Sequence, residues 1–217
     1  MFLHNHPKFK DLIETIAFEQ TIPLAIVEKD YWVMHALWGL SQCGFTYYFK
    51  GGTSLSKGFA VIKRFSEDLD LQIDPPKHLK VYTGKNHQKA KHRESRQVFF
   101  EWIVENISIP DLKLGSHRAT ESKVRNYAIE LHYNSLFPRD EIIKRHVLLE
   151  IGFARVTPFE TKEISSWSYD RAAQSGLEIN DNRAKAVPLY LPEYTLIEKL
   201  DAINGKYQSE KAPADWV

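Results

Sequence analysis

The amino-acid sequence predicts an α+β domain in which a small mixed β-sheet is flanked by helices. Apolar residues recur at helical spacing in several long segments, and short runs rich in aromatic and aliphatic residues alternate with them. The chain has 217 residues, of which 43% are hydrophobic and 26% are charged. This length and composition favour a globular protein with one ample core over a disordered chain.

The first sixty residues are predicted to form two helices, a strand and a third, short helix. Apolar positions at helical spacing place the first helix over 8–20. The second helix begins after Pro23 and ends before Gly44, and its apolar positions nearly surround it, so we expect it to be buried. The aromatic run at 45–50 predicts a strand, and two glycines then turn the chain into a short helix over 54–60.

The middle of the chain is predicted to combine strands with one long helix. Residues 69–73 alternate apolar and polar side chains, which predicts a strand with one face in the core. A helix over about 86–107 begins with basic residues and continues with aromatic and aliphatic ones. Two further strands are expected at 126–133 and 146–151, where apolar residues alternate with polar ones or follow one another.

The last quarter of the chain is expected to be loop-rich over 157–186, with a short strand at 187–191. Pro192 then precedes a helix with leucines and an isoleucine at helical spacing. We therefore expect a core with N-terminal helices over 1–190 and the start of a C-terminal helical region over 191–217, whose remainder is missing.

Charge and cysteine content exclude several classes of protein. The 29 lysines and arginines nearly balance the 28 aspartates and glutamates, which argues against binding nucleic acid through bulk charge but not through a local basic stripe. A single cysteine, Cys43, excludes an internal disulfide framework and a thiolate zinc cluster. No stretch approaches the roughly 20 apolar residues that cross a bilayer, and the start lacks signal-peptide features. We expect a cytoplasmic protein with no membrane contact.

A glycine pair after the strand at 45–50 predicts a triphosphate site. Gly51 and Gly52 let the backbone approach phosphate oxygens without a Cβ in the way. The helix that begins at Thr53 and Ser54 offers unpaired N–H donors at the positive end of its dipole, and the two hydroxyls add further donors. Lys57, one turn later, supplies a charge for the same phosphates.

Two aspartates on the following strand predict a metal site beside these glycines. Asp68 and Asp70 are two positions apart, so both side chains point to the same face. Mg²⁺ takes carboxylate oxygens together with substrate phosphates, and a two-metal site needs a third carboxylate on a neighbouring strand. Glu150, flanked by apolar residues on a predicted strand, is the candidate for it. Its alternative is a glutamate at the edge of the core, paired with an arginine.

Each of these patterns is weak alone, since most Gly-Gly pairs form hairpin turns and most D-x-D pairs face water. Their order along the chain is more specific: a strand, GG[ST], a helix, a D-x-D strand and a later acid. This order favours a phosphate and metal site over a hairpin turn with aspartates that face water.

The motifs that carry this order closely resemble the AbiEii/AbiGii family of toxin nucleotidyltransferases, which are relatives of the MenT toxins. The resemblance spans roughly residues 26–206. It is carried by EKDYWV (28–33), FKGGTSLSK (49–57), RFSEDLDL (64–71), LLEIG (148–152) and PEYTLIEKLDAI (192–203). It implies a fold similar to that of the DNA polymerase β-type nucleotidyltransferases.

The resemblance also implies roles for single residues. Gly52, Thr53 and Ser54 would bind the triphosphate, and Asp68 and Asp70 would bind magnesium. Two residues of the C-terminal region match functional positions of the family: Lys199, and less securely Asp215. Ser66 matches a serine that some relatives use for modification or autoinhibition. The family's substrates imply a nucleoside triphosphate, the 3′ end of tRNA as acceptor, and a cognate antitoxin as partner.

The sequence alone leaves several alternatives open. Without the resemblance, Lys199 is interpreted as a surface lysine. The charged residues at 28–30 are interpreted as forming ion pairs within a buried helix. The basic run at 85–96 is typical of a solvated helix face, with an RNA-binding stripe as its alternative. The histidines show no ligand spacing that predicts zinc. The acceptor could also be a protein or a small molecule, or the chain could be a nucleotide-binding regulatory module without turnover.

Overall fold

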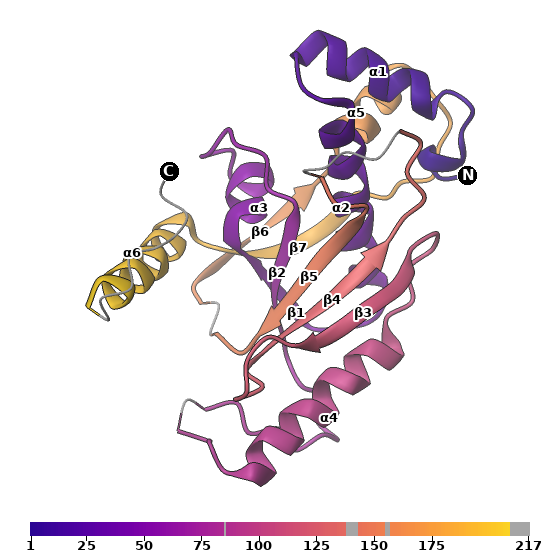
Figure 1. The fold of residues 1–217 in the computed structure, drawn as a ribbon. Coiled ribbons are helices and arrows are strands. Elements are labelled where there is room, and N and C mark those ends of the chain that lie inside the picture. The colour runs from indigo at the N-terminus through magenta and orange to yellow at the C-terminus, as the bar shows by residue number, and fades with distance from the viewer. Residues whose placement is uncertain (85, 138–142, 155–156, 209–217) are drawn as a thin grey trace.

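The computed structural model describes residues 1–84, 86–137, 143–154 and 157–208, which form a seven-stranded mixed sheet with helices on both faces (Figure 1). The strand order is β3-β4-β5-β2-β1-β7-β6. The strands are β1 (Tyr47–Lys50), β2 (Asp68–Ile73), β3 (Lys113–Ala119), β4 (Asn126–His132), β5 (His146–Gly152), β6 (Phe159–Ile164) and β7 (Ala184–Tyr190). The helices are α1 (Phe9–Gln20), α2 (Leu24–Gln42), α3 (Gly51–Thr53), α4 (Ala90–Asn106), α5 (Trp167–Gln174) and α6 (Pro192–Gln208), with short turns η1 (Leu3–Asn5) and η2 (Ser54–Gly58). The α+β class with a mixed sheet is therefore confirmed.

The centre of the sheet joins segments that are far apart in the sequence. Strand β2 pairs antiparallel with β1 and parallel with β5, while β1 pairs parallel with β7 on its other side. Antiparallel pairs complete both edges, β3 with β4 and β6 with β7. The strand that bears the two aspartates thus lies in the middle of the sheet.

One face of the sheet forms the core. Leu69, Leu71 and Ile73 of β2 alternate with polar residues and are almost fully buried, as are the matching positions of β4 and β5. Helix α2 packs on this face and is itself buried nearly all round, as its sequence predicts. Helix α4 joins the same face through Phe100, which stacks on Tyr127 of β4 with ring centroids 4.8 Å apart.

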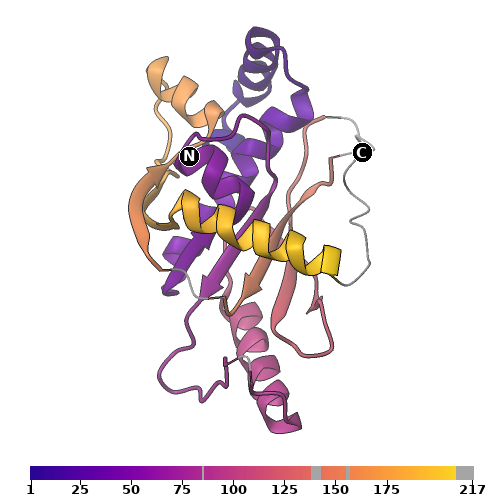
Figure 2. The same ribbon diagram turned by 90° about the vertical axis from the view of Figure 1, so that its left-hand side faces the viewer.

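Helix α6 lies on the opposite side of the sheet. In Figure 2 it crosses in front of the strands, whereas Figure 1 shows α2 and α4 on the far side. Its apolar residues stay largely in solvent, with Leu196, Ile197 and Leu200 all more than half exposed. In the described part of the chain, none of the helices is both long enough and apolar enough to cross a membrane.

Two expectations about elements were wrong. The stretch 157–186 contains β6, α5 and the start of β7 rather than loops. Strand β3 has no counterpart among the expected elements. Both β3 and β6 are edge strands with mostly exposed, polar residues, so neither carries the apolar alternation of a half-buried strand. The local sequence signal for helix α5 is its N-cap residue, Ser166. Its hydroxyl accepts a hydrogen bond from the backbone N–H of Tyr169.

The helix expected at 54–60 also differs, since it starts three residues earlier and then widens. Helix α3 covers Gly51–Thr53, and the π turn η2 follows, with the Phe59 N–H donating to the Ser54 carbonyl. The wider turn brings Gly58 against Leu189 of β7, where a Cβ would approach the leucine to 2.4 Å. Single π turns of this kind often accompany functional sites.

Candidate functional site

Three carboxylates line the sheet face opposite the core. Asp68 and Asp70 occupy alternate, half-buried positions of β2, and Asp70 is the direct partner of Glu150 on the parallel strand β5. Directly paired residues of neighbouring strands point to the same face. The three side chains therefore form one row, which we call the carboxylate row.

The electrostatics of the carboxylate row favour a bound cation. Burial, followed by the charges of Asp70 and Asp68, raises the pKa of Glu150. Burial and the neighbouring Glu67 raise the pKa of Asp68, and Lys29 partly opposes this shift. A divalent cation would relieve this mutual repulsion. Because all of these donors are carboxylate oxygens, they fit a hard ion such as Mg²⁺.

The glycine turn lies against this row. Gly51 has φ +79°, and a Cβ on it would come within 2.6 Å of the Asp70 carboxylate oxygen Oδ2. A Cβ on Gly52 would come within 2.6 Å of the Ser66 hydroxyl and 3.3 Å of the Arg64 guanidinium. Gly51 is thus required by its backbone conformation and by its contact with Asp70, and a Cβ on Gly52 would displace the Ser66 hydroxyl.

The two hydroxyls after the glycines are engaged with the backbone. Thr53 donates from Oγ1 to the Asp68 carbonyl over 2.6 Å, which ties the turn to the start of β2. Ser54 is fully buried and donates to the Gly51 carbonyl over 2.9 Å. Their side chains shape the turn, while the backbone N–H groups remain the donors that a phosphate would meet.

Lys57 already has a partner in the protein. Its ammonium lies 2.7 Å from the carboxylate of Asp30 on α2 and 4.3 Å from the centroid of the Trp167 ring. The backbone N–H of Trp167 donates to the other oxygen of Asp30 over 2.9 Å. This buried pair joins α2, η2 and α5, and it accounts for Asp30, the second acid of the EKDYWV motif.

Lys29, from the same motif, lies beside Glu67, next to the start of the carboxylate row, and its charge acts on Asp68. It is 1% exposed, its ammonium lies 3.1 Å from Glu67, and it donates to the carbonyls of Lys144 and His146. The sequence predicts an ion pair of Lys29 within α2, but its partner is Glu67, which precedes Asp68 in the chain. A lysine among the aliphatic and aromatic residues of a buried helix is the sequence signal that could have indicated a role outside the helix.

A pocket of about 370 Å³ opens beside the glycine turn. Its lining includes the Lys57–Asp30 pair together with Lys63, Arg64, Phe65, Ser66 and Trp167. Lys63 and Arg64 match the phosphates of a nucleotide, and the rings of Phe65 and Trp167 match its base.

The remaining candidates lie elsewhere. Lys199 is exposed on α6 and, among the described residues, makes no ion pair. Asp215 lies outside the described residues. Of the basic run, Arg96 is buried and donates to four backbone carbonyls, and α4 packs on the face away from the carboxylate row. This placement favours a structural role for part of the run.

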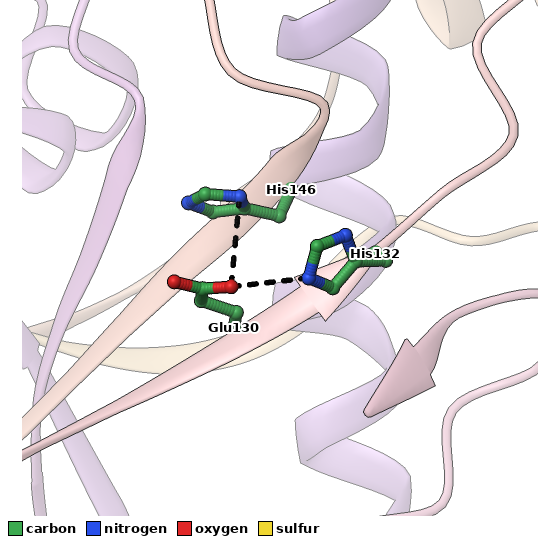
Figure 3. A group of neighbouring side chains, drawn as sticks. All are labelled: Glu130, His132 and His146. Carbon is green, nitrogen blue, oxygen red and sulfur yellow. Dashed lines mark hydrogen bonds and ion pairs between the residues drawn. The ribbon is translucent and has the colours of Figure 1, made fainter. Parts of the chain in front are cut away.

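Sequence reasoning missed a second cluster on the carboxylate-row face. Glu130 and His132 of β4 meet His146 of β5, with their ligand atoms all within 4.8 Å of one another (Figure 3). Only the antiparallel register, in which His132 pairs with His146, brings them together. The sole local signal was the spacing of Glu130 and His132, two positions apart on one strand.

Comparisons with known proteins complete these observations. The model of the family described as nucleotidyl transferase AbiEii toxin, type IV toxin–antitoxin system, matches residues 35–216. A solved structure from Helicobacter pylori, described as a proposed nucleotidyltransferase, is 16% identical with a TM-score of 0.39, over 80% of this chain and 57% of that one. The JHP933 structure, also from Helicobacter pylori, is 15% identical with a TM-score of 0.35, over 78% and 54%. The chain thus spans little more than half of either structure. Among curated proteins there is no match.

Proposed function

The chain belongs to the AbiEii family of nucleotidyl transferase toxins of type IV toxin–antitoxin systems, and from this premise we propose that it transfers a nucleoside monophosphate from a nucleoside triphosphate to an acceptor hydroxyl with Mg²⁺. The observation that carries the proposal is the contact between the glycine turn and the carboxylate row. Gly51 packs against Asp70, and Asp70 is the register partner of Glu150.

Asp68, Asp70 and Glu150 would hold the metal, since they present oxygen donors from adjacent strands on one face. Bound there, Mg²⁺ supplies charge neutralisation of the triphosphate and a template for in-line displacement. The backbone at Gly51 and Gly52 would bind phosphate oxygens, and Lys63 and Arg64 of the adjoining pocket would add positive charge. Ser66, beside Gly52, would contact the same phosphates.

The reaction joins the acceptor oxygen to the α-phosphorus and breaks the bond from that phosphorus to the bridging oxygen, so pyrophosphate leaves. The acceptor proton passes to a carboxylate of the row. Most of the rate enhancement would come from positioning and from charge stabilisation in a fixed site.

We further propose the 3′ end of tRNA as the acceptor, an antitoxin as the partner and a cytoplasmic setting; membership of a toxin–antitoxin family supports the partner. Lys199 and Asp215 would contribute from the C-terminal region. A protein or a small molecule is the alternative acceptor.

The test is to incubate the chain with each labelled nucleoside triphosphate, Mg²⁺ and total RNA. We expect label on RNA of tRNA size for the wild type and none for Asp68→Asn or Asp70→Asn. Glu160→Gln, which changes an exposed glutamate of edge strand β6, serves as the matched control and should keep activity. Equal labelling by wild type and Asp68→Asn would refute the assignment. Label on protein or on metabolites instead of RNA would identify one of these as the acceptor. Nucleotide binding without pyrophosphate release would indicate a regulatory module.

A further inference from the structure

The Glu130–His132–His146 cluster has the geometry of a metal site that is separate from the carboxylate row. The Nε2 atom of His132 lies 3.1 Å from Oε2 of Glu130, and Nδ1 of His146 lies 3.9 Å from the same oxygen. Three ligands held at 2.0–2.2 Å around one tetrahedral ion would be about 3.4 Å apart. The observed separations lie on either side of that value, so small side-chain rotations would close the site.

The backbone fixes the three ligands without help from loops. Glu130 and His132 are two positions apart on β4, so both point to one face, and His146 is the direct cross-strand partner of His132. The imidazole rings of His132 and His146 have centroids 5.2 Å apart. Figure 3 shows both rings turned toward the carboxylate between them.

Neighbouring residues are arranged to leave room for the cluster. A Cβ on Gly115 of β3 would lie 2.3 Å from the His132 ring and 3.3 Å from Cβ of Glu130, so a glycine is needed where that ring lies over the edge strand. Ser116 adds a side-chain hydrogen bond to Glu130. Outer partners of this kind orient metal ligands.

The cluster is distinct from the carboxylate row although it lies on the same face. Leu148 of β5 is the register partner of Glu130 on one side and of Asp68 on the other, so it separates the two sets. Strands β4 and β2 are two positions apart in the sheet, a distance of about 10 Å. The donor sets also differ, because the row offers only oxygen and the cluster offers two imidazoles and one carboxylate.

We infer that Glu130, His132 and His146 bind one divalent transition-metal ion of the zinc class. Two imidazoles and a carboxylate are a ligand set that zinc uses in proteins, and imidazole disfavours Mg²⁺. The side chains are 14–46% exposed, which leaves an entry path and at least one coordination position open to water or an anionic oxygen.

Metal binding by the intact, metal-stripped chain tests the inference directly. Zinc is titrated calorimetrically in excess Mg²⁺, which occupies the carboxylate row, and cobalt is used as a spectroscopic probe. We expect one equivalent of zinc that Mg²⁺ does not displace, and cobalt absorption typical of low coordination. The variants His132→Ala, His132→Gln and His146→Ala should lose saturable binding. His117→Ala, which changes an exposed histidine of β3, should bind like the wild type.

A second variant leaves every ligand in place. Gly115→Ala should push the His132 ring aside and weaken zinc binding roughly tenfold or more. In the absence of metal its melting temperature should stay close to that of the wild type, because the half-exposed ring can move into solvent. Zinc should raise the melting temperature of the wild type and not of the variants at His132 and His146.

The outcomes separate this inference from the proposed transfer activity. Asp68→Asn should abolish transfer and keep zinc binding. If the wild type shows no saturable zinc, if the variants at His132 and His146 bind as it does, or if Asp68→Asn removes the zinc, the cluster is only a histidine–carboxylate ion pair and the inference is wrong.

Discussion

Gly51 combines a left-handed backbone conformation with a close contact to a carboxylate, and both favour glycine at this position. Its φ is +79°, and a Cβ would lie 2.6 Å from Oδ2 of Asp70. We expect Gly51→Ala to lower the free energy of unfolding by about 1–3 kcal/mol and to abolish transfer, because the new methyl group displaces Asp70.

Gly44 supplies the matched control for that substitution. It has φ +75° but open space around its Cβ position. Gly44→Ala should therefore show the backbone strain alone, with transfer intact. Chemical denaturation and the labelling assay measure the two effects, and equal activity of both variants would contradict the role of the Gly51–Asp70 contact.

The Lys57–Asp30 pair allows a prediction about a buried charge. Asp30 is 1% exposed, and Lys57 lies 2.7 Å from it. Lys57→Met leaves that carboxylate without its cation and should cost about 3–5 kcal/mol of unfolding free energy. The double variant with Asp30→Asn should recover much of the loss, since no charge then stays buried.

Denaturation of the two single variants and the double variant forms a cycle that measures the coupling. If Lys57→Met instead unfolds like the wild type but weakens triphosphate binding, Lys57 acts on phosphate as the sequence predicts and not as part of this pair.

At the scale of elements, His35 links α2 to the segment before β3. Its Nε2 donates to the Pro110 carbonyl over 2.9 Å, and its Nδ1 accepts from the Asn182 amide over 3.0 Å. These partners fix a neutral imidazole, and burial lowers the pKa of His35 to about 4. Protonation would set two donors, Nδ1–H and the Asn182 amide, against each other.

This network predicts acid sensitivity of the fold. Because the pKa of His35 is lower in the folded than in the unfolded chain, its contribution is complete above pH 6.5 and is lost as pH falls toward 4. The total is about 3 kcal/mol, and burial of His4 acts in the same direction. Urea unfolding at several pH values should give a shallower acid dependence for His35→Gln than for the wild type. Parallel curves would contradict this account.

Helix α6 carries Lys199 in solvent, so its role can be separated from folding. We expect Lys199→Ala to change the melting temperature by less than about 1 °C, because exposed positions contribute little to stability. Transfer should fall sharply if the family's lysine is carried over to this position. Lys10→Ala on α1, which is also exposed, is the control and should alter neither property. Full activity of Lys199→Ala would remove Lys199 from the proposed site.

At the scale of the whole molecule, the sequence predicts the centre of the sheet better than its edges. Strands β2, β4 and β5 are half-buried, and burial of one face is what creates their apolar pattern. Edge strands β3 and β6 bury little, so charged and polar residues fill them and no pattern marks them. Contacts that depend on register, such as Lys57 with Asp30, are likewise invisible in a linear pattern.

The same distinction explains which parts of the candidate site could be predicted. The glycine turn and the aspartates lie within one short segment, 47–73, so local spacing alone places them together. Glu130 and His146 meet only because β4 and β5 pair in one particular register. Lys29 reaches Glu67 only because α2 packs beneath β2.

The alternation of β2, β4 and β5 has a consequence for how this protein can change over time. Residues at odd-numbered positions pack in the core, and residues at even-numbered positions include the three carboxylates of the proposed Mg²⁺ site and the three ligands of the proposed zinc site. Substitutions that change substrate or ion specificity can therefore accumulate at the even-numbered positions of these strands with little loss of thermal stability. A library randomised at those positions alone should yield mostly folded proteins, whereas one randomised at their odd-numbered neighbours should yield mostly aggregates.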